Sequence, residues 1–118
     1  MENIATYKVV FQISNNDTFV QKSLLRQLTS LLGTITPIRI EVVTHGYGID
    51  LLLGDSPYRS KLQTLERHGV RFLACEKTLA NENMDTSGLV DFAETVPGAL
   101  AHIIQRQTEG WSYIKAGY

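Results

Sequence analysis

The sequence has a single cysteine, Cys75, and almost no excess of either charge. A single thiol cannot form an internal disulfide or a metal site built from several thiolates. The formal net charge is −1, from 11 basic and 12 acidic residues, and no cluster of Lys or Arg is present. We therefore expect no nucleic-acid partner, because no basic surface is available for the phosphate backbone.

Long hydrophobic runs are missing as well. No apolar segment approaches the roughly 20 residues that a membrane-spanning helix needs, so we expect no association with a membrane. The first residues, MENIATYKVVF, lack the basic region and long apolar segment of a signal peptide. Together with the lone cysteine, these absences predict a protein of a reducing compartment, the cytoplasm.

The sequence does contain an alternation of strand and helix patterns along its whole length. Segments rich in β-branched and aromatic residues predict strands at 7–13, 38–43, 70–75, 92–96 and 111–115. Apolar residues at helical spacing and helix-start signals predict helices at 20–32, 57–68, 77–83 and 99–109. This alternation predicts one α/β domain with a parallel sheet and helices on both faces.

Local signals predict where the helices end and which way they face. Asp17 is expected to cap the first helix or to charge its first turn, and Gly33 to end it. The sequence DSP at 55–57 predicts that Pro57 occupies the first position of the second helix. In the last helix His102 is expected to face solvent. The inward residues of that helix are expected to be Leu100, Ile103 and Ile104.

Candidate functional residues gather where the predicted strands end. Parallel strands share one carboxyl edge, and ligands of open α/β sheets bind there. The first strand is followed by Asn15 and Asn16, the second by HGYG at 45–48, and the third ends at Cys75. Residues far apart in the sequence are therefore expected to meet at one rim of the sheet.

Cys75 has two interpretations. A helix that starts directly after it would direct free N–H groups and the positive end of the helix dipole at the sulfur, which favours the thiolate. Lys77 would add to this effect and Glu76 would oppose it. Alternatively, Cys75 is a buried structural residue, as free cysteines often are.

His45 also has two interpretations. It could hold the Cys75 thiolate or shuttle a proton, or it could be a turn histidine bonded to the backbone. Trp111 and Tyr113 could form a subunit contact or cover the last strand. His68 is expected at a helix end, where a positive charge is favourable.

Several common motifs are absent. Position 81 is Asn81, whereas a phosphatase loop would need an arginine six residues after its cysteine. Neither a Cys-x-x-Cys pair, nor a dinucleotide-binding fingerprint, nor a P-loop occurs. We expect no cofactor and no metal. A nucleotide or flavin is the weaker alternative, suggested only by the polar loop after the first strand.

Four segments, in their order and spacing, resemble the DsrE/DsrF-like family of small sulfur-metabolism proteins, in particular its short single-domain members. They are KVVFQIS at 8–14, IEVVTHGYGIDLLL at 40–53, GVRFLACEKTL at 69–79 and RQTEGWSYIK at 106–115. The resemblance implies one domain over residues 1–118, with three α/β/α layers and a five-stranded, mainly parallel sheet, flavodoxin-like in outline. It also implies an oligomer, either a homo-oligomer such as a trimer or a hexamer, which we expect, or a hetero-oligomer with sibling subunits.

In sulfur-relay members of that family a cysteine carries a persulfide between partner proteins. Cys75 matches the cysteine that follows strand three, and His45 falls in the histidine–glycine turn of the short members. Many relatives have Asn where this chain has Lys77, which changes the charge near the thiol.

The resemblance thus predicts a sulfurtransferase-like persulfide carrier that works with sulfur donor and acceptor proteins. Cys75 and His45 are the predicted catalytic residues. The predicted ligand-binding residues are Asn15, Asn16, Gly46, Gly48 and Lys77. The alternative is a non-enzymatic oligomeric binding module, in which the rim at Asn15, His45 and Cys75 binds a small ligand or a partner protein.

Overall fold

A single five-stranded sheet forms the centre of the molecule. The structure, a computed structural model, describes residues 6–117. The strands are β1 (Tyr7–Ile13), β2 (Ile38–Thr44), β3 (Val70–Cys75), β4 (Glu94–Val96) and β5 (Ser112–Lys115). They lie in the order β4-β3-β2-β1-β5, and every neighbouring pair is parallel. The predicted parallel sheet is confirmed, with β4 shorter than the segment 92–96.

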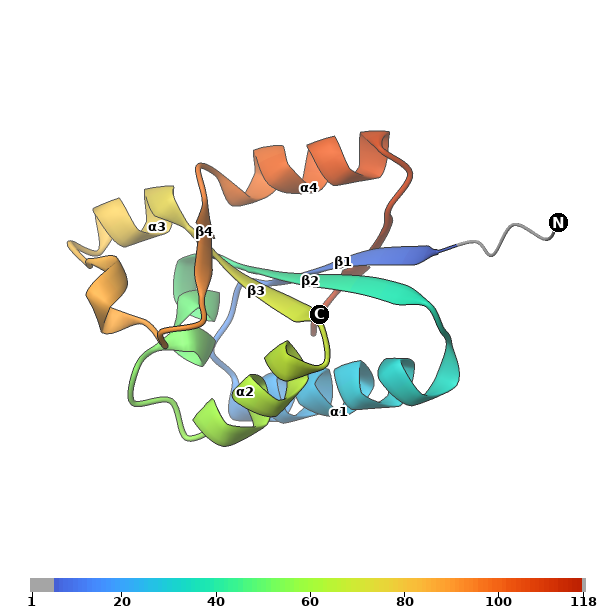
Figure 1. Ribbon diagram of the computed structural model, residues 1–118. Coiled ribbons are helices and arrows are strands. Elements are labelled where there is room, and N and C mark those ends of the chain that lie inside the picture. Colours follow the sequence, from blue (N-terminus) through green and yellow to red (C-terminus); the bar gives the residue numbers. More distant parts are fainter. Residues whose placement is uncertain (1–5, 118) are drawn as a thin grey trace, which may run out of the picture.

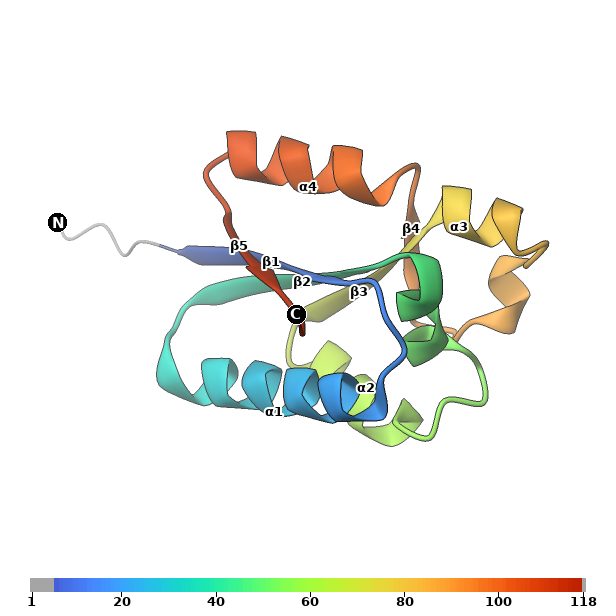
Figure 2. The ribbon, with the colours of Figure 1, turned by 180° about the vertical axis from the view of Figure 1, so that it is seen from behind.

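Helices cover both faces of the sheet. They are α1 (Thr18–Thr34), α2 (Arg59–Arg67), α3 (Glu76–Asn81) and α4 (Ala99–Thr108), with two 3₁₀ helices, η1 (Gly46–Leu52) and η2 (Thr86–Gly88). Figures 1 and 2 show α1 and α2 on one side of the sheet and α4 on the other, with α3 beside the start of α4. The predicted three-layer α/β/α architecture is confirmed.

The two sides of the sheet are packed unequally. The larger core lies between the sheet and the α1–α2 layer, and it includes Phe11, Leu28 and Phe72. The smaller core lies under α4 and consists of Val10, Val43, Leu73, Cys75, Val96, Ala99, Ile103 and Trp111. Residues two positions apart in a strand point to the same face, so Glu41 shares the face of Val43 in β2 and Arg71 shares the face of Leu73 in β3.

The start of α1 follows the sequence prediction and its end does not. Asp17 caps the helix, because its carboxylate accepts hydrogen bonds from the N–H groups of Phe19 at 2.8 Å and Val20 at 3.2 Å. The prediction that Gly33 ends the helix is wrong. The helix continues through Gly33 to Thr34, and Gly33 does not adopt the left-handed backbone that a glycine cap requires.

The predicted start of α2 is also wrong, because Pro57 lies before the helix rather than at its first position. Ser56 forms a local turn instead: its hydroxyl accepts from the Tyr58 N–H at 3.2 Å and its carbonyl from the Arg59 N–H at 3.2 Å. The helix begins only at Arg59. A Ser hydroxyl that bonds to nearby backbone competes with helix formation, which accounts for the delay.

The predicted orientation of α4 is wrong for three of its four residues. Leu100 and Ile104 are 61% and 63% exposed, and of the expected inward residues only Ile103 is buried. His102 does not face solvent but lies partly buried against Glu41 of β2. The helix turns its polar side toward the sheet because a buried carboxylate lies beneath it.

Candidate functional site

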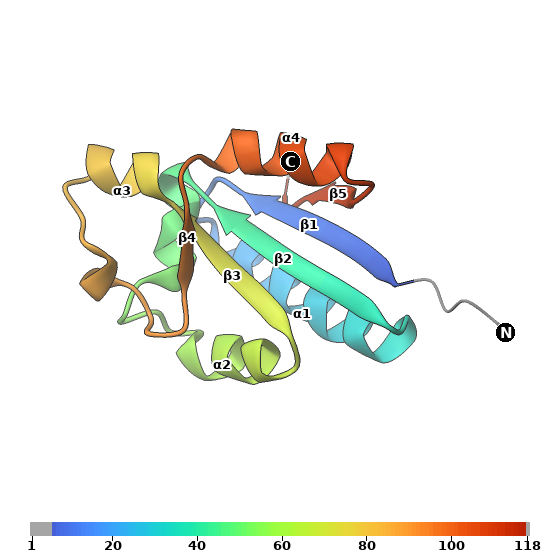
Figure 3. The ribbon, with the colours of Figure 1, turned by 45° about the horizontal axis from the view of Figure 1, so that its top comes forward.

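The carboxyl ends of the strands form the rim that the sequence predicted. Ile13 pairs with Thr44, Thr44 pairs with Ala74, and Cys75 pairs with Val96, so β1 to β4 end side by side. In Figure 3 the arrowheads of β1 and β2 point to this same end of the sheet.

Cys75 lies at this rim between the beginnings of two helices. It is the last residue of β3 and the N-cap of α3, as the sequence predicted. Its Sγ accepts a hydrogen bond of 3.4 Å from the N–H of Ala99, the first residue of α4. The residue is only 5% exposed. The sulfur is therefore held by backbone donors from two helices and is nearly closed off from solvent.

The surroundings of Cys75 lower the pKa of its thiol. Burial acts in the opposite direction and is the largest single effect. Hydrogen bonds from the backbone and hydroxyl of Thr78 and from the amides of Ala99 and Lys77 together outweigh it. Donors of this kind stabilise an anionic sulfur more than a neutral one. The geometry thus favours the thiolate, as the reactive interpretation of Cys75 requires.

Thr78 is a candidate site residue that the sequence interpretation missed. Its hydroxyl is one of the groups that lower the pKa of the Cys75 thiol, and its Oγ1 accepts the N–H of Gly46 at 3.0 Å. The hydroxyl thereby links the turn after β2 to the thiol. A signal was present in the sequence, because the third residue of a helix is well placed to reach back to the cap. In α3 the cap is Cys75 and the third residue is Thr78.

His45 lies at the rim but points toward β1 rather than toward the thiol. Its Nε2 accepts a hydrogen bond of 2.7 Å from the Gln12 amide, whose oxygen accepts in turn from the Tyr113 hydroxyl. A ring that accepts at Nε2 is neutral and carries its proton on Nδ1. Burial lowers the pKa of His45, consistent with a neutral ring. Within residues 6–117 no hydrogen bond joins His45 to Cys75, and the catalytic role of His45 stays a prediction.

The two glycines of the 45–48 turn give it its shape. A Cβ at Gly48 would lie 2.0 Å from the carbonyl oxygen of Ile13, so only glycine allows η1 to pack against the end of β1. Gly46 has a left-handed backbone with φ of 54°, which favours glycine. These observations explain both residues structurally, and their ligand-binding role stays a prediction.

The polar loop after β1 is held by its own hydrogen bonds. The Asn15 Oδ1 accepts from the N–H of Asp17 at 3.1 Å, and the Asn16 Nδ2 donates to Asp50 at 3.0 Å. Both asparagines are part of the rim but bond within the loop or to η1. Their predicted role in ligand binding stays a prediction.

Lys77, in contrast, lies close to the thiol. A Cβ at Gly98 would be 3.6 Å from the Lys77 Cε and 3.7 Å from its Nζ, so the Lys77 ammonium lies over the turn that leads into α4. The carboxylate of Glu76 accepts a hydrogen bond of 2.8 Å from the Thr95 hydroxyl. The Lys77 ammonium is thus near the segment that carries the Ala99 amide. The Glu76 carboxylate is instead bonded to Thr95 of β4.

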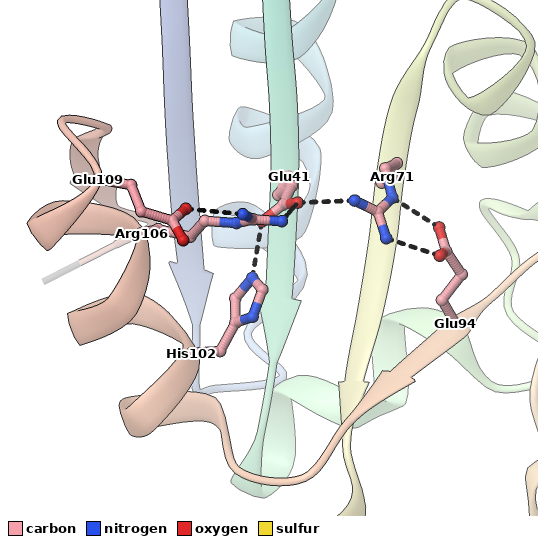
Figure 4. A network of polar contacts seen from close by, with 6 residues as sticks. All are labelled: Glu41, Arg71, Glu94, His102, Arg106 and Glu109. Atoms are coloured by element: carbon pink, nitrogen blue, oxygen red, sulfur yellow. Dashed lines mark hydrogen bonds and ion pairs between the residues drawn. The ribbon is translucent and has the colours of Figure 1, made fainter.

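A second polar cluster lies on the same face of the sheet and is centred on Glu41 (Figure 4). Glu41 is 1% exposed and accepts hydrogen bonds from Arg71 at 2.9 Å, from His102 at 2.7 Å, and from Arg106 at 2.9 and 2.7 Å. Arg71 continues to Glu94, and Arg106 to Glu109. Burial raises the pKa of Glu41, but the bonds from Arg106 and His102 outweigh it, and the net shift is downward.

The sequence interpretation missed this cluster. Glu41 lies in the alternating half of a predicted strand, a pattern typical of a partly exposed position. Its partners His102 and Arg106 are 61 and 65 residues away in the chain. No local signal distinguishes such a residue from an ordinary exposed glutamate.

Three further observations concern the kinds of site and segment that are present. A groove of about 830 Å³ lies between α1 and α2, on the face of the sheet opposite Cys75, and contains none of the predicted site residues. Among residues 6–117, no group of three or more His, Cys, Asp and Glu side chains could hold a metal ion. None of the helices in the same part of the chain combines the length and hydrophobicity needed to cross a membrane.

Comparison with known proteins identifies similar sequences and folds. A family model described as the DsrE/DsrF-like family matches residues 8–116. MTH1491 from Methanobacterium thermoautotrophicum, described as a protein of unknown function, has a similar structure: the TM-score is 0.90 and the identity 38%, over 92% of this chain and 98% of that one. A comparison with curated proteins gave no match.

Two more distant structures share the fold. YchN from E. coli is 19% identical with a TM-score of 0.72, over 92% of this chain and 98% of that one. BT1422 from Bacteroides thetaiotaomicron is 14% identical with a TM-score of 0.70, over 91% and 93% of the two chains. At these identities the likeness concerns the fold alone.

Proposed function

This chain belongs to the DsrE/DsrF-like family, and from that premise we propose that Cys75 accepts a sulfane sulfur and carries it as a persulfide. Family membership associates the chain with sulfur metabolism. The observation that carries the finer proposal is the set of donors around the sulfur, from Thr78, Ala99 and Lys77. These donors favour the thiolate, and the thiolate is the nucleophile in sulfur exchange.

The proposed loading step is a thiol exchange that needs no oxidant. The Cys75 thiolate attacks the outer sulfur of a donor persulfide, a new S–S bond forms on Cys75, the donor S–S bond breaks, and the donor thiolate leaves. In delivery, an acceptor thiolate attacks the outer sulfur on Cys75, and the Cys75 thiolate leaves. A thiol with a lowered pKa leaves faster, so the same donors assist both steps.

Access to the sulfur limits which donors can react. Cys75 is 5% exposed, so a donor must approach at the rim, beside the flexible side chain of Lys77. The Lys77 ammonium attracts anionic donors, and a small polysulfide anion combines negative charge with little bulk. A partner protein would deliver or remove sulfur at the same place.

The proposal includes assembly into a homo-oligomer, a trimer or a hexamer. Large apolar side chains are exposed on α4 and β5, namely Leu100, Ile104, Tyr113 and Ile114. Exposed apolar side chains of this size are expected in subunit contacts. A cytoplasmic location would keep the single thiol reduced.

The burial of Cys75 favours a second candidate, a non-enzymatic oligomeric binding module. In that case the rim at Asn15, His45 and Cys75 binds a small ligand or a partner protein without covalent chemistry. A Cys75→Ser variant would then retain full binding, whereas a persulfide carrier loses its function with the thiol.

Intact-mass measurement after exposure to polysulfide tests the main proposal. We expect the wild type to gain the mass of one sulfur and to lose it on treatment with a reducing thiol. The Cys75→Ser variant is expected to gain no mass. A wild type that is alkylated at Cys75 but never gains sulfur would contradict the proposal. An equal gain by the Cys75→Ser variant would contradict it as well.

A further inference from the structure

We infer that Glu41, through His102 and Arg106, is a positioning residue for the Cys75 thiol: it anchors α4 to the sheet and so keeps the Ala99 amide on the sulfur. The link to sulfur transfer rests on the proposed function. The anchoring itself concerns only the reduced thiol and can be measured without any sulfur donor.

One stripe of α4 carries all the contacts that this inference needs. Ala99, His102 and Arg106 are spaced by three and four residues, which places them on the same side of a helix. Ala99 donates its amide to the Cys75 sulfur at the first turn. His102 and Arg106 contact Glu41 in the following turns. The helix therefore joins the thiol and the buried carboxylate along a single line.

Apolar packing alone holds α4 weakly. Its buried side chains are Ala99, which is small, and Ile103, whereas Leu100 and Ile104 face away from the sheet. The contact with Glu41 is stronger, because Arg106 binds the carboxylate with two nitrogens. Such charge-assisted hydrogen bonds are stronger than hydrogen bonds between neutral groups. Much of what keeps α4 in place is therefore polar.

Glu41 is suited to act as a fixed anchor. It lies on β2, the central strand of the sheet, where its carboxylate is also bonded to Arg71 of β3 (Figure 4). A buried carboxylate that loses partners is costly. Movement of α4 away from the sheet would remove His102 and Arg106 from Glu41, so this cost opposes the movement.

The competing explanation is that β4 alone positions the amide. Val96 pairs with Cys75 and precedes Ala99 by only three residues, so strand pairing could hold the amide without any help from Glu41. In that case the Glu41 cluster would contribute to stability, and the thiol would not respond to it. The two explanations predict different thiol titrations.

The test compares the pH dependence of Cys75 alkylation by iodoacetamide in matched variants. We expect His102→Leu and Arg106→Gln to raise the midpoint by about one pH unit, a roughly tenfold loss of thiolate at neutral pH, as expected for loss of one hydrogen bond to a charged group. His102→Gln keeps an N–H donor and is expected to stay near the wild type. Arg59 of α2 forms an exposed ion pair with Asp91. Arg59→Gln removes this distant cation and is expected to leave the midpoint unchanged.

Amide hydrogen exchange at Ala99 gives a second readout that remains useful where a variant is less stable. We expect faster exchange at Ala99 in His102→Leu, with the strand amides of β3 still protected. Unchanged midpoints and unchanged Ala99 exchange in folded variants would overturn the inference in favour of β4 pairing. Wild-type protein that shows the expected titration but never loads sulfur would contradict the proposed function and leave this inference supported.

Discussion

The N–H of Ala99 lies 3.4 Å from the sulfur of Cys75, although the two residues are 24 positions apart in the chain. This hydrogen bond joins the first turn of α4 to the end of β3. It places the thiol where two helices begin, and both helices present N–H groups to it. The arrangement explains how a nearly buried cysteine has a lowered rather than a raised pKa.

Loss of the Thr78 hydroxyl is expected to weaken the thiolate. In Thr78→Val the side chain keeps its shape but can no longer donate to Cys75 or accept from Gly46. We expect the Cys75 pKa to rise by about one unit, measured from the pH dependence of alkylation. Thr64→Val is the control, because the Thr64 hydroxyl bonds only within α2. Equal midpoints for Thr78→Val and wild type would show that the hydroxyl is dispensable.

Two glycines are expected to respond to alanine in opposite directions. Gly48→Ala places a methyl group 2.0 Å from the Ile13 carbonyl oxygen, so we expect a loss of about 1–3 kcal/mol in the free energy of unfolding. At Gly33, inside α1, a methyl group meets nothing within 4 Å, so Gly33→Ala is expected to stabilise by about 0.5–1 kcal/mol. Urea denaturation measures both. A neutral Gly48→Ala would mean that η1 can move away from β1.

The buried carboxylate of Glu41 is expected to make the free energy of unfolding depend on pH. Removal of one partner from a buried ionic cluster is strongly destabilising, so Glu41→Gln should lower the free energy of unfolding by about 3 kcal/mol at neutral pH. The pKa of Glu41 is lowered from its ordinary value of 4.5, so the unfolded chain takes up a proton first as the pH falls. The stabilisation is complete above that ordinary value and is lost as the pH falls through the lowered pKa.

Denaturation curves of wild type and Glu41→Gln over a range of acidic pH measure this effect. We expect the difference between the two proteins to shrink as the pH falls. A difference that stays constant across the range would indicate that the pKa of Glu41 is the same in the folded and the unfolded protein, and it would contradict the lowered pKa.

The exposed apolar residues of α4 are expected to lie in a subunit contact. The double variant Leu100→Glu with Ile104→Glu should have a smaller mass in solution than the wild type, because it places charges in an apolar contact. Light scattering after gel filtration measures the mass. Phe19→Glu is the control, since Phe19 is 78% exposed on α1, in the opposite layer. A monomeric wild type, or a double variant of unchanged mass, would contradict this contact.

The sheet and its rim could be predicted from the sequence because their signals are local. β-branched runs mark β1, β2 and β3, and alternation with helices implies parallel pairing, which brings their carboxyl ends together. The position of Cys75 before a helix could be predicted for the same reason. The helix ends were less predictable, because the Ser56 turn and the continuation through Gly33 depend on local hydrogen bonding that competes with simple capping rules.

The contacts between α4 and the sheet could not be predicted, because they join residues that are distant in the sequence. Glu41 is buried only because Arg71, His102 and Arg106 come together around it in the folded chain. Apolar spacing in α4 does not distinguish buried from exposed apolar residues, so it predicts Leu100 and Ile104 in the core, whereas both are exposed. The direction of the His45 ring likewise follows from its bond to Gln12, which no local pattern indicates.

The most direct test of the account is a pH titration of thiolate absorbance in the reduced protein. Cys75 is the only cysteine, so subtraction of the Cys75→Ser titration removes the tyrosine signal and leaves one thiol. We expect a midpoint below about 8.5, the value of a free cysteine. A midpoint at or above that value would show that the effect of burial on the pKa exceeds that of the hydrogen-bond donors. It would contradict the claim that the site stabilises the Cys75 thiolate.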